Sequence, residues 1–547
     1  MLFTSCTFII FLAATLLVYY LTPLHLPQDR SGRRVSFVRP PDALPSRSIV
    51  LLLASLVFYA FAGWEKLLYV LGTALLAWLF SRRIAGVNEQ LAGRLASVQN
   101  DKAEERRLKA LYRRRARRWL VFGIFTVLLI YAHCKYLPQL ADALNGLLTR
   151  MDLTPVRTWD IVVPLGLSYY TLSIVGYLLD VFWNKQKHER NFPLFLLCVL
   201  YFPQILQGPI SRYREMRVEY LRETHFSAER IARGAQLMLW GFFKKLVIAD
   251  RLNIFVTGVL DNSPAYQGVV IWVTALASTF QLYADFSGCM DIAAGVSELF
   301  GIQIAKNFDH PFAARSVAEW WRRWHITLCA WMKDYVYLPL AVSPRLSRRS
   351  MRIRKRRGPK AARAYVTVIT LGVVWLLTGL WHDISWCYLA WGCYYALFLI
   401  VDTVLQPKRL TAKLGIDGES PAWRRFQMAR TTLIFSMGRL LTVPGDLRVT
   451  LDLVRSMFTR FNPWALWDGT LCTAGLDLPN VSLSLCLVLL LLAVERAQIQ
   501  NGPIRDRLAR TWLPLRWLVW YAALAGILIF GIYGAGYSAS SFAYMNF

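Results

Sequence analysis

The chain has 547 residues, of which 56% are hydrophobic and 18% are charged. Soluble globular domains carry about 45–50% apolar and about 25% charged residues, so this composition argues against a water-soluble globule. The formal net charge of +29 would favour nucleic-acid binding in a soluble chain, but here the basic residues lie between long apolar stretches. We therefore predict one membrane-embedded domain over residues 1–547, with the lipid bilayer and no nucleic acid as a partner.

Apolar stretches recur along the whole chain, and they predict an all-α polytopic membrane protein with roughly 11–13 membrane helices of about 20 residues each. Two stretches, 160–182 and 192–213, contain Pro164, Gly166 and Pro203. We expect broken or re-entrant helices there, buried in protein, because lipid cannot satisfy the freed backbone groups. The predicted segments lie near 3–22, 48–63, 66–81, 119–137, 160–182, 192–206, 234–258, 268–284, 365–381, 387–402, 432–446, 480–496 and 513–534.

Two strongly basic stretches set the predicted orientation. Residues 82–118 contain twelve basic residues against four acidic ones, and residues 341–365 contain ten basic residues and no acidic one. Basic loops stay on the cytoplasmic side of a membrane. We therefore predict that both stretches are cytoplasmic loops and that the N-terminus lies outside. The helix-prone part, 103–119, is expected to lie on the anionic inner leaflet.

Two histidines are candidates for catalysis, because polar groups inside apolar segments are costly and so indicate function. Three tryptophans and two arginines directly precede His325, and His382 ends an apolar run after Trp381. Helical spacing predicts that Trp321 lies beside His325. A buried, neutral imidazole can take a proton from a hydroxyl near neutral pH. Each ring taken alone also fits a structural histidine bonded to a backbone carbonyl.

A second group of polar residues lies in another apolar segment. Asp285 and Asp291 are six residues apart, with Ser287 between them. This group could bind a cation or a polar substrate, or it could bond across helices. The sequence has no cysteine pair with zinc-ligand spacing and no HExxH motif. We therefore predict no metal site and no bound cofactor.

An ordered set of motifs lies in the middle of the chain. The motifs are VPLGLSYYT (163–171), YLLDV (177–181), YFPQ (201–204), GPISRY (208–213), GFFKKLVIAD (241–250), FQLYADFSG (280–288), NF (307–308), PF (311–312), WRRWHITL (321–328), KDYVYLPL (333–340) and GLWH (379–382). In this set the sequence resembles the membrane-bound O-acyltransferase (MBOAT) family, in particular its bacterial polysaccharide branch, which includes alginate O-acetyltransferases. Any one motif is weak, but their common order is specific.

The resemblance implies helices around a central tunnel, with N-terminal helices at 1–137, an MBOAT-like catalytic core at 160–402 and C-terminal helices at 403–547. His382 matches the family's invariant histidine, and His325 matches its second active-site position. The residues expected to bind substrate are Trp321, Arg322, Arg323, Trp324, Trp381, Asp285 and Ser287.

The resemblance further implies an O-acyltransferase of the bacterial inner membrane. It would move a short acyl group, expected to be acetyl, from a cytoplasmic thioester donor to a hydroxyl of a cell-envelope or exported polysaccharide. The donor would be acetyl-CoA or an acyl carrier protein thioester, and a periplasmic acyltransferase partner could receive the group first. Two alternatives stay open. One is D-alanyl transfer from a carrier protein to an envelope polymer, and the other is a proton-coupled transporter or flippase in which the histidines relay protons.

Overall fold

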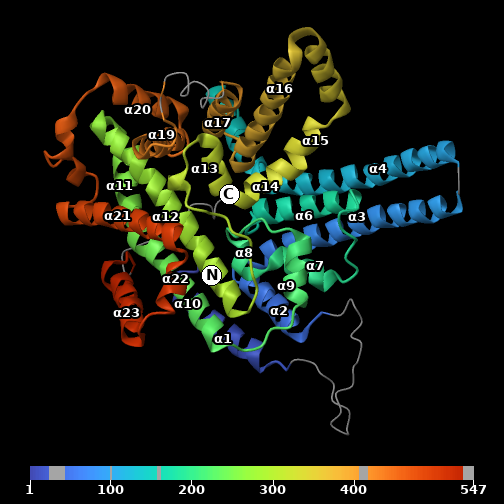
Figure 1. Ribbon diagram of the computed structural model, residues 1–547, viewed down its shortest axis with the longest axis horizontal. Coiled ribbons are helices and arrows are strands. Elements are labelled where there is room, and N and C mark those ends of the chain that lie inside the picture. The colour runs from blue at the N-terminus through green and yellow to red at the C-terminus, as the bar shows by residue number, and fades with distance from the viewer. Residues whose placement is uncertain (24–43, 99–100, 157–161, 406–414, 416, 534–547) are drawn as a thin grey trace, which may run out of the picture. The chain divides into compact units, whose positions relative to one another are not determined.

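The computed structural model describes residues 1–23, 44–98, 101–156, 162–405, 415 and 417–533 (Figure 1). Its regular elements are helices, with one isolated β-bridge between Phe308 and Trp324. The predicted all-α fold is therefore confirmed. By packing, the chain divides into unit 1, which comprises Met1–Gly234 and Val296–Ala305, and unit 2, which comprises Ala235–Gly295 and the described residues from Lys306 on. This division by packing does not test whether the chain is one membrane-embedded domain, so that expectation stays a prediction.

Seven helices in the described residues are long and apolar enough to cross a membrane, and three apolar helices are shorter, α1, α2 and α6. These helices make the chain a multi-pass membrane protein. The seven long ones are α3 (Trp64–Ser97), α4 (Lys102–Lys135), α12 (Val269–Leu299), α16 (Pro344–His382), α17 (Trp386–Leu405), α21 (Leu478–Asn501) and α23 (Leu513–Phe530).

Unit 1 is built around the antiparallel helices α3 and α4, which lie side by side (Figure 1). They approach closely because Gly123 on α4 faces the Phe80 ring, and a Cβ at position 123 would lie 3.0 Å from it. α6 packs against both helices. The other helices of unit 1 are α1 (Cys6–Leu21), α2 (Ser46–Ala60), α5 (Leu137–Arg150), α6 (Leu167–Phe182), α7 (Phe192–Leu200), α8 (Phe202–Ile205) and α9 (Tyr213–Leu221).

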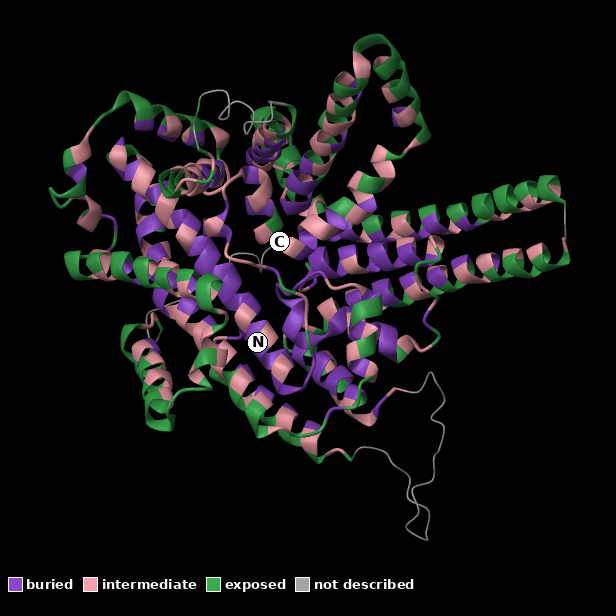
Figure 2. Cartoon of the chain, in the orientation of Figure 1, coloured by how far each residue is buried: buried purple, intermediate pink, exposed green. Residues whose placement is uncertain are grey.

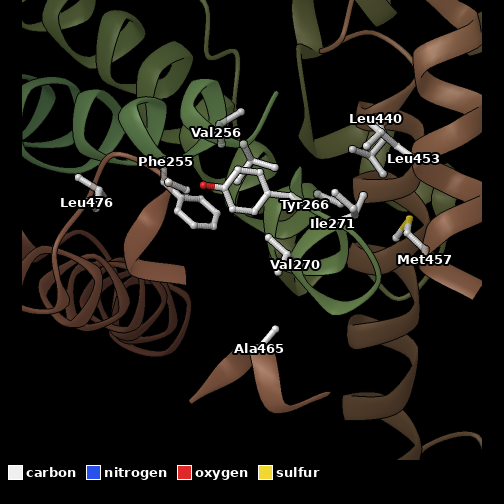
Figure 3. Packing of buried hydrophobic residues seen from close by; sticks show 13 residues of the cluster. Phe255, Val256, Tyr266, Val270, Ile271, Leu440, Leu453, Met457, Ala465 and Leu476 are labelled. Carbon is white, nitrogen blue, oxygen red and sulfur yellow. The ribbon is translucent and has the colours of Figure 1, made fainter. Parts of the chain in front are cut away.

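Unit 2 has an apolar core where α11 and the start of α12 meet α19 and α20. Phe255, Val256, Ile271, Leu440 and Met457 are among the buried side chains that pack there (Figure 3). Beyond the spanning helices, unit 2 contains η1 (Phe243–Ala249), α11 (Asp250–Asp261), η2 (Ser263–Ala265), η3 (Pro311–Ala313), α13 (Val317–Arg323), α14 (Ile326–Met332), η4 (Lys333–Tyr337), α15 (Leu338–Ala341), α19 (Pro421–Leu440), α20 (Leu447–Thr459), η5 (Pro463–Leu466), η6 (Thr470–Thr473) and α22 (Ile504–Leu508). Along the described chain, the division falls within α10 (Ala228–Phe242), again within α12 after Gly295, and after Ala305.

The predicted interruptions of the apolar stretches are confirmed. α6 begins only after Gly166, which has a left-handed backbone (φ 67°), and Tyr201 separates α7 from α8. By contrast, most of the described residues in the stretches 82–118 and 341–365 are helical and do not form loops. They continue α3, α4 and α16 as exposed helix (Figure 2), because they are rich in arginine, lysine, alanine and leucine, which are strong helix formers. Within α16 only Gly358 (φ 82°) departs from helical geometry.

Candidate active site

A cavity of about 500 Å³ lies within unit 2. Its walls come mainly from α13, α14, α16, α17 and α19, and most of the lining side chains are apolar or aromatic. Both predicted catalytic histidines, His325 and His382, line this cavity. The structure thus brings together two residues that are far apart in the sequence.

His382 is the last residue of α16, and aromatic rings surround its imidazole. The ring stacks on Tyr388 with centroids 5.5 Å apart and meets Trp391 edge-on at 5.3 Å. It is 4% exposed. The helix ends here because Asp383 has an extended backbone. The Asp383 side chain is not among those that line the cavity.

The position of His382 depends on the close packing of α16 against α17. A Cβ on Gly379 would lie 2.4 Å from the backbone oxygen of Tyr388, and a Cβ on Gly392 would lie 2.6 Å from that of Trp375. Real Cβ atoms do not approach so closely, so only glycine lets the two backbones meet at these points. The glycines therefore place the end of α16 directly against the aromatic residues of α17.

His325 lies at the break between α13 and α14, in a left-handed conformation (φ 47°, ψ 48°). Its Nδ1 lies 3.4 Å from Asn307 Oδ1, which also accepts hydrogen bonds from the Thr327 backbone N–H (3.1 Å) and hydroxyl (2.9 Å). Because an amide oxygen only accepts, Nδ1 donates and Nε2 carries the lone pair. Strained backbone at a non-glycine residue often marks a functional site.

The protonation state of His325 follows from its burial. The residue is 2% exposed and lies outside the apolar spans. Burial lowers its pKa to about 3, so the ring is neutral at pH 7. The helical spacing expected to place Trp321 beside His325 does not apply, because α13 ends at Arg323 and the chain turns before His325.

The predicted tryptophans take different positions around the cavity. Trp321 and Trp324 line it, and Trp321 meets Trp375 edge-on at 4.6 Å. Trp381 is not a lining residue, but its ring centroid lies 6.1 Å from that of His325 and 4.7 Å from that of His382. Trp381 therefore packs against both histidines from outside the cavity.

The two predicted arginines also separate. Arg322 is exposed and lines the cavity. Arg323 instead pairs with Glu319 at 3.0 Å and donates to the Asp309 backbone oxygen at 3.0 Å. Arg323 thus braces the segment that carries Asn307 rather than facing the cavity.

Asp285 and Ser287 lie in a buried ion cluster and not among the cavity-lining residues. Asp285 accepts from Lys245 at 2.6 Å, and Lys245 also pairs with Asp250 at 2.9 Å. Ser287 accepts from Lys244 at 2.9 Å. The sequence left open whether this group binds a cation or polar substrate or bonds across helices. These contacts favour bonding across helices.

The cavity includes residues that the sequence analysis did not select. Lys333 and Tyr337 lie in the KDYVYLPL motif, so the resemblance already carried a signal for them. Tyr388 and Trp391 follow His382 on the next helix and look like ordinary apolar sequence. Arg439 could have been selected from the sequence, because a charged residue inside the apolar stretch 432–446 indicates a functional site.

Arg439 lies at the wall between two cavities of unit 2. It lines the histidine cavity and also a neighbouring cavity of about 450 Å³, which has polar walls that include Asn253 and Gln281. Its guanidinium donates to Thr442 Oγ1 at 2.9 Å. Its Nε is buried and has no hydrogen-bond partner in the part of the chain that is described. Arg439 therefore offers a donor to a ligand.

No three His, Cys, Asp or Glu side chains of the described residues are grouped so that they could hold a metal ion. The chemistry that the described cavity supports is acid–base chemistry on a bound substrate. Apolar walls exclude water, which protects a reactive acyl group from hydrolysis. A neutral imidazole in such a site can accept a proton from an alcohol.

Comparisons with known proteins place the chain among acyltransferases. The family model for MBOAT, the membrane-bound O-acyltransferase family, matches residues 182–353, which include His325. The chain is also 28% identical over 464 residues to the probable alginate O-acetylase AlgI of Pseudomonas aeruginosa, a match that covers 84% of this chain and 78% of that protein. The chain belongs to the membrane-bound O-acyltransferase family. This MBOAT is therefore an O-acyltransferase, as predicted, and the transporter alternative is set aside.

Two further relatives have names that describe other acyl-transfer reactions. The peptidoglycan O-acetyltransferase of Helicobacter pylori is 27% identical over 380 residues, which cover 64% of this MBOAT and 63% of the relative. The teichoic acid D-alanyltransferase of Streptococcus thermophilus is 27% identical over 282 residues, which cover 50% of this MBOAT and 65% of the relative.

Proposed function

We propose that this MBOAT transfers a short acyl group, acetyl in the first place, from a thioester donor to a hydroxyl of a cell-envelope or exported polysaccharide. The observation that carries the proposal is the presence of His325 and His382 on one largely apolar cavity. The names of two relatives, an alginate O-acetylase and a peptidoglycan O-acetyltransferase, support acetyl as the group and a polysaccharide as the acceptor.

In the proposed reaction, His382 takes the proton from the acceptor hydroxyl. The alcohol oxygen forms a bond to the thioester carbonyl carbon, and the tetrahedral intermediate then loses the thiolate as the C–S bond breaks. The proton on His382 passes to the thiolate, so the imidazole returns to its neutral form. Nε2 of His325, which carries a lone pair, accepts a hydrogen bond from a substrate N–H or O–H group.

We propose acetyl-CoA or an acyl carrier protein thioester as the donor. Arg322 and Lys333 lie on the cavity wall, and ten basic residues follow on 341–365. Either donor carries phosphate or acidic groups that this positive charge would attract. The basic stretches would face the cytoplasm, with the N-terminus outside a bacterial inner membrane. A periplasmic acyltransferase partner would then receive the group or present the polysaccharide.

The test uses inverted membrane vesicles that contain the protein and receive acetyl-CoA labelled in its acetyl group. We expect alkali-labile label on the polysaccharide fraction and release of free thiol. His382→Ala should abolish both signals, whereas His225→Ala, which changes an exposed loop histidine, should leave them at the wild-type level. Wild-type transfer by a folded His382→Ala protein would refute the proposal.

D-alanyl transfer is the second candidate, because D-alanyltransferases are among the relatives. The same vesicles would receive a carrier protein loaded with labelled D-alanine. Label on the polymer from this donor, with none from acetyl-CoA, would replace acetyl by D-alanyl in the proposal. Label from acetyl-CoA alone would exclude the second candidate.

A further inference from the structure

Unit 1 contains a cleft of its own, separate from the histidine cavity of unit 2. This α3–α4 cleft has a volume of about 730 Å³ and three walls: α3, α4 and the turn after α6. Its lining is basic and aromatic, with Glu89 as the one carboxylate among the lining residues that are described. The arginines and tryptophans of the lining are Trp78, Arg82, Arg83, Arg115, Trp119 and Arg190.

The register of α3 against α4 sets the level of this cleft in the membrane. Gly123 faces Phe80, and one turn further along the pair, the Arg83 guanidinium lies 5.9 Å from the Trp119 ring centroid. On α3 the apolar run ends just before Arg82, and on α4 the apolar run begins at Trp119. Both helices therefore change from apolar to charged at the same level, which is the signature of a membrane surface.

The third wall is fixed to α3 by two hydrogen bonds. Ser81 Oγ lies 2.8 Å from His188 Nδ1, and Trp78 Nε1 donates to the Glu189 backbone oxygen at 2.7 Å. These bonds hold Arg190 at the cleft. The Glu189 carboxylate is engaged elsewhere, because it accepts from Arg217 at 2.8 Å, so it does not neutralise the cleft.

The cleft keeps a net positive charge that no neighbouring group removes. Its four arginines are exposed, and none of them takes part in an ion pair within the described residues. Burial lowers the pKa of His188, so that ring stays neutral at pH 7. Guanidinium groups bind phosphate oxygens in a two-pronged geometry. The arginines of the cleft therefore suit a phosphate group.

We propose that the α3–α4 cleft binds the phosphate-bearing headgroup of an anionic phospholipid. A lipid fits better than a soluble phosphate compound, because apolar side chains continue directly from the cleft into the membrane-spanning parts of both helices. Leu79 on α3 lines the cleft and is 43% exposed. Phe122 on α4, one turn beyond Trp119, is 56% exposed. These side chains give the acyl chains of a bound lipid an apolar surface next to the arginines.

The test compares two triple variants of the full chain, each of which removes three positive charges from α3 or α4. The cleft variant is Arg82→Gln, Arg83→Gln and Arg115→Gln. The control variant is Arg106→Gln, Arg107→Gln and Arg113→Gln, which changes exposed α4 residues that do not line the cleft. Native mass spectrometry would measure phosphatidylglycerol retained by each protein from mixed micelles with excess phosphatidylcholine. Equal melting temperatures of the variants would show that both are folded.

We expect the wild type and the control variant to retain phosphatidylglycerol. The cleft variant should bind it roughly 100-fold more weakly, because it loses three of the four guanidinium groups that would contact the phosphate. Wild-type retention by the cleft variant, or an equal loss in the control variant, would overturn the proposal. Glycerol 3-phosphate is the soluble competitor. Release of the lipid at equal concentrations of this compound would assign the cleft to a soluble phosphate ligand and would also overturn the proposal.

Discussion

Two groups of polar side chains are buried in unit 2, and they are buried in opposite ways. Around Lys245, every charge has a counter-charge at short range: Asp285 at 2.6 Å and Asp250 at 2.9 Å. Around His325 and His382, the neighbours are aromatic rings and open space of about 500 Å³. The first group pairs its charges with one another, whereas the second leaves room for a substrate.

In a membrane protein, a buried polar group can serve structure or function, and its partners distinguish the two. Both groups place polar side chains in or beside apolar segments, so the presence of a buried polar residue alone does not identify a functional site. The ion cluster satisfies its charges internally, which makes it a connection between helices. The two histidines line an open cavity, which makes them available for chemistry.

The largest effect should come from breaking the ion cluster. Lys245→Met leaves two buried carboxylates without their cation, and we expect it to lower the free energy of unfolding by about 3–5 kcal/mol. Denaturant unfolding in detergent would measure this loss. Lys306→Met, which removes the exposed partner of Asp309, is the control and should change stability by less than about 1 kcal/mol. A stable Lys245→Met protein that has lost transfer activity would place the cluster in the active site instead.

Filling the cavity should affect activity and leave the fold in place. Leu371 lines the cavity, and Leu371→Trp would occupy space that the substrate needs. We expect kcat/KM to fall about 100-fold, because a misplaced reacting group costs that much. Val373→Trp, on the same helix at an exposed position, is the matched control. Equal activity of the two variants would show that this part of the cavity holds no substrate.

Arg439→Gln should have a more modest effect on binding. The change removes a charged donor from the wall between the two cavities, so we expect KM for one substrate to rise about tenfold with kcat little changed, a loss of about 1.4 kcal/mol. Titration of each substrate in turn would identify which one Arg439 contacts. Arg425→Gln, at an exposed position of α19, should leave both KM values unchanged.

The smallest effect concerns Glu189, an ion-paired carboxylate outside the apolar spans. Burial acts to raise its pKa, but hydrogen bonds from Asn191, Arg217 and Tyr213 outweigh burial and lower the pKa below its usual value. A lowered pKa in the folded state stabilises the protein above the unfolded pKa of about 4.3, and this stabilisation is lost as the pH falls through the lower folded pKa.

Glu189→Gln should therefore lower the free energy of unfolding by about 1 kcal/mol at pH 7. The difference from wild type should shrink below about pH 4, where the wild-type carboxylate becomes protonated. Melting curves from pH 7 to pH 3 would measure the gap. A constant gap over this range would contradict the assigned ion pair.

The two histidines that line the cavity could be selected from the sequence because they lie in continuous motifs. WRRWHITL and GLWH each keep their residues together in the sequence, so the resemblance carried both positions. The contacts of Arg323 could not be predicted from its motif. It is next to Arg322 in the sequence, but it pairs with Glu319 and the Asp309 backbone, because the end of α13 directs the two side chains to different neighbours.

The basic stretches show the same limit for the fold. Their charge predicted a side of the membrane, and their composition is that of a helix. Only the packing of α3 against α4, with Gly123 facing Phe80, brings Arg83 to Trp119 and forms the cleft between them. The cleft depends on a register between two helices, which no single stretch of sequence contains.

Helical structure and membrane location could be predicted from the sequence, because hydropathy and helix propensity are properties of local stretches. The family could be predicted too, and the two histidines could be selected as candidates, because their motifs are continuous. Three features depend on the three-dimensional packing: Asp285 pairs with Lys245, Arg439 reaches the histidine cavity, and a cavity lies beside His382. Those outcomes depend on distances between helices, and such distances are set by the packing of all side chains together.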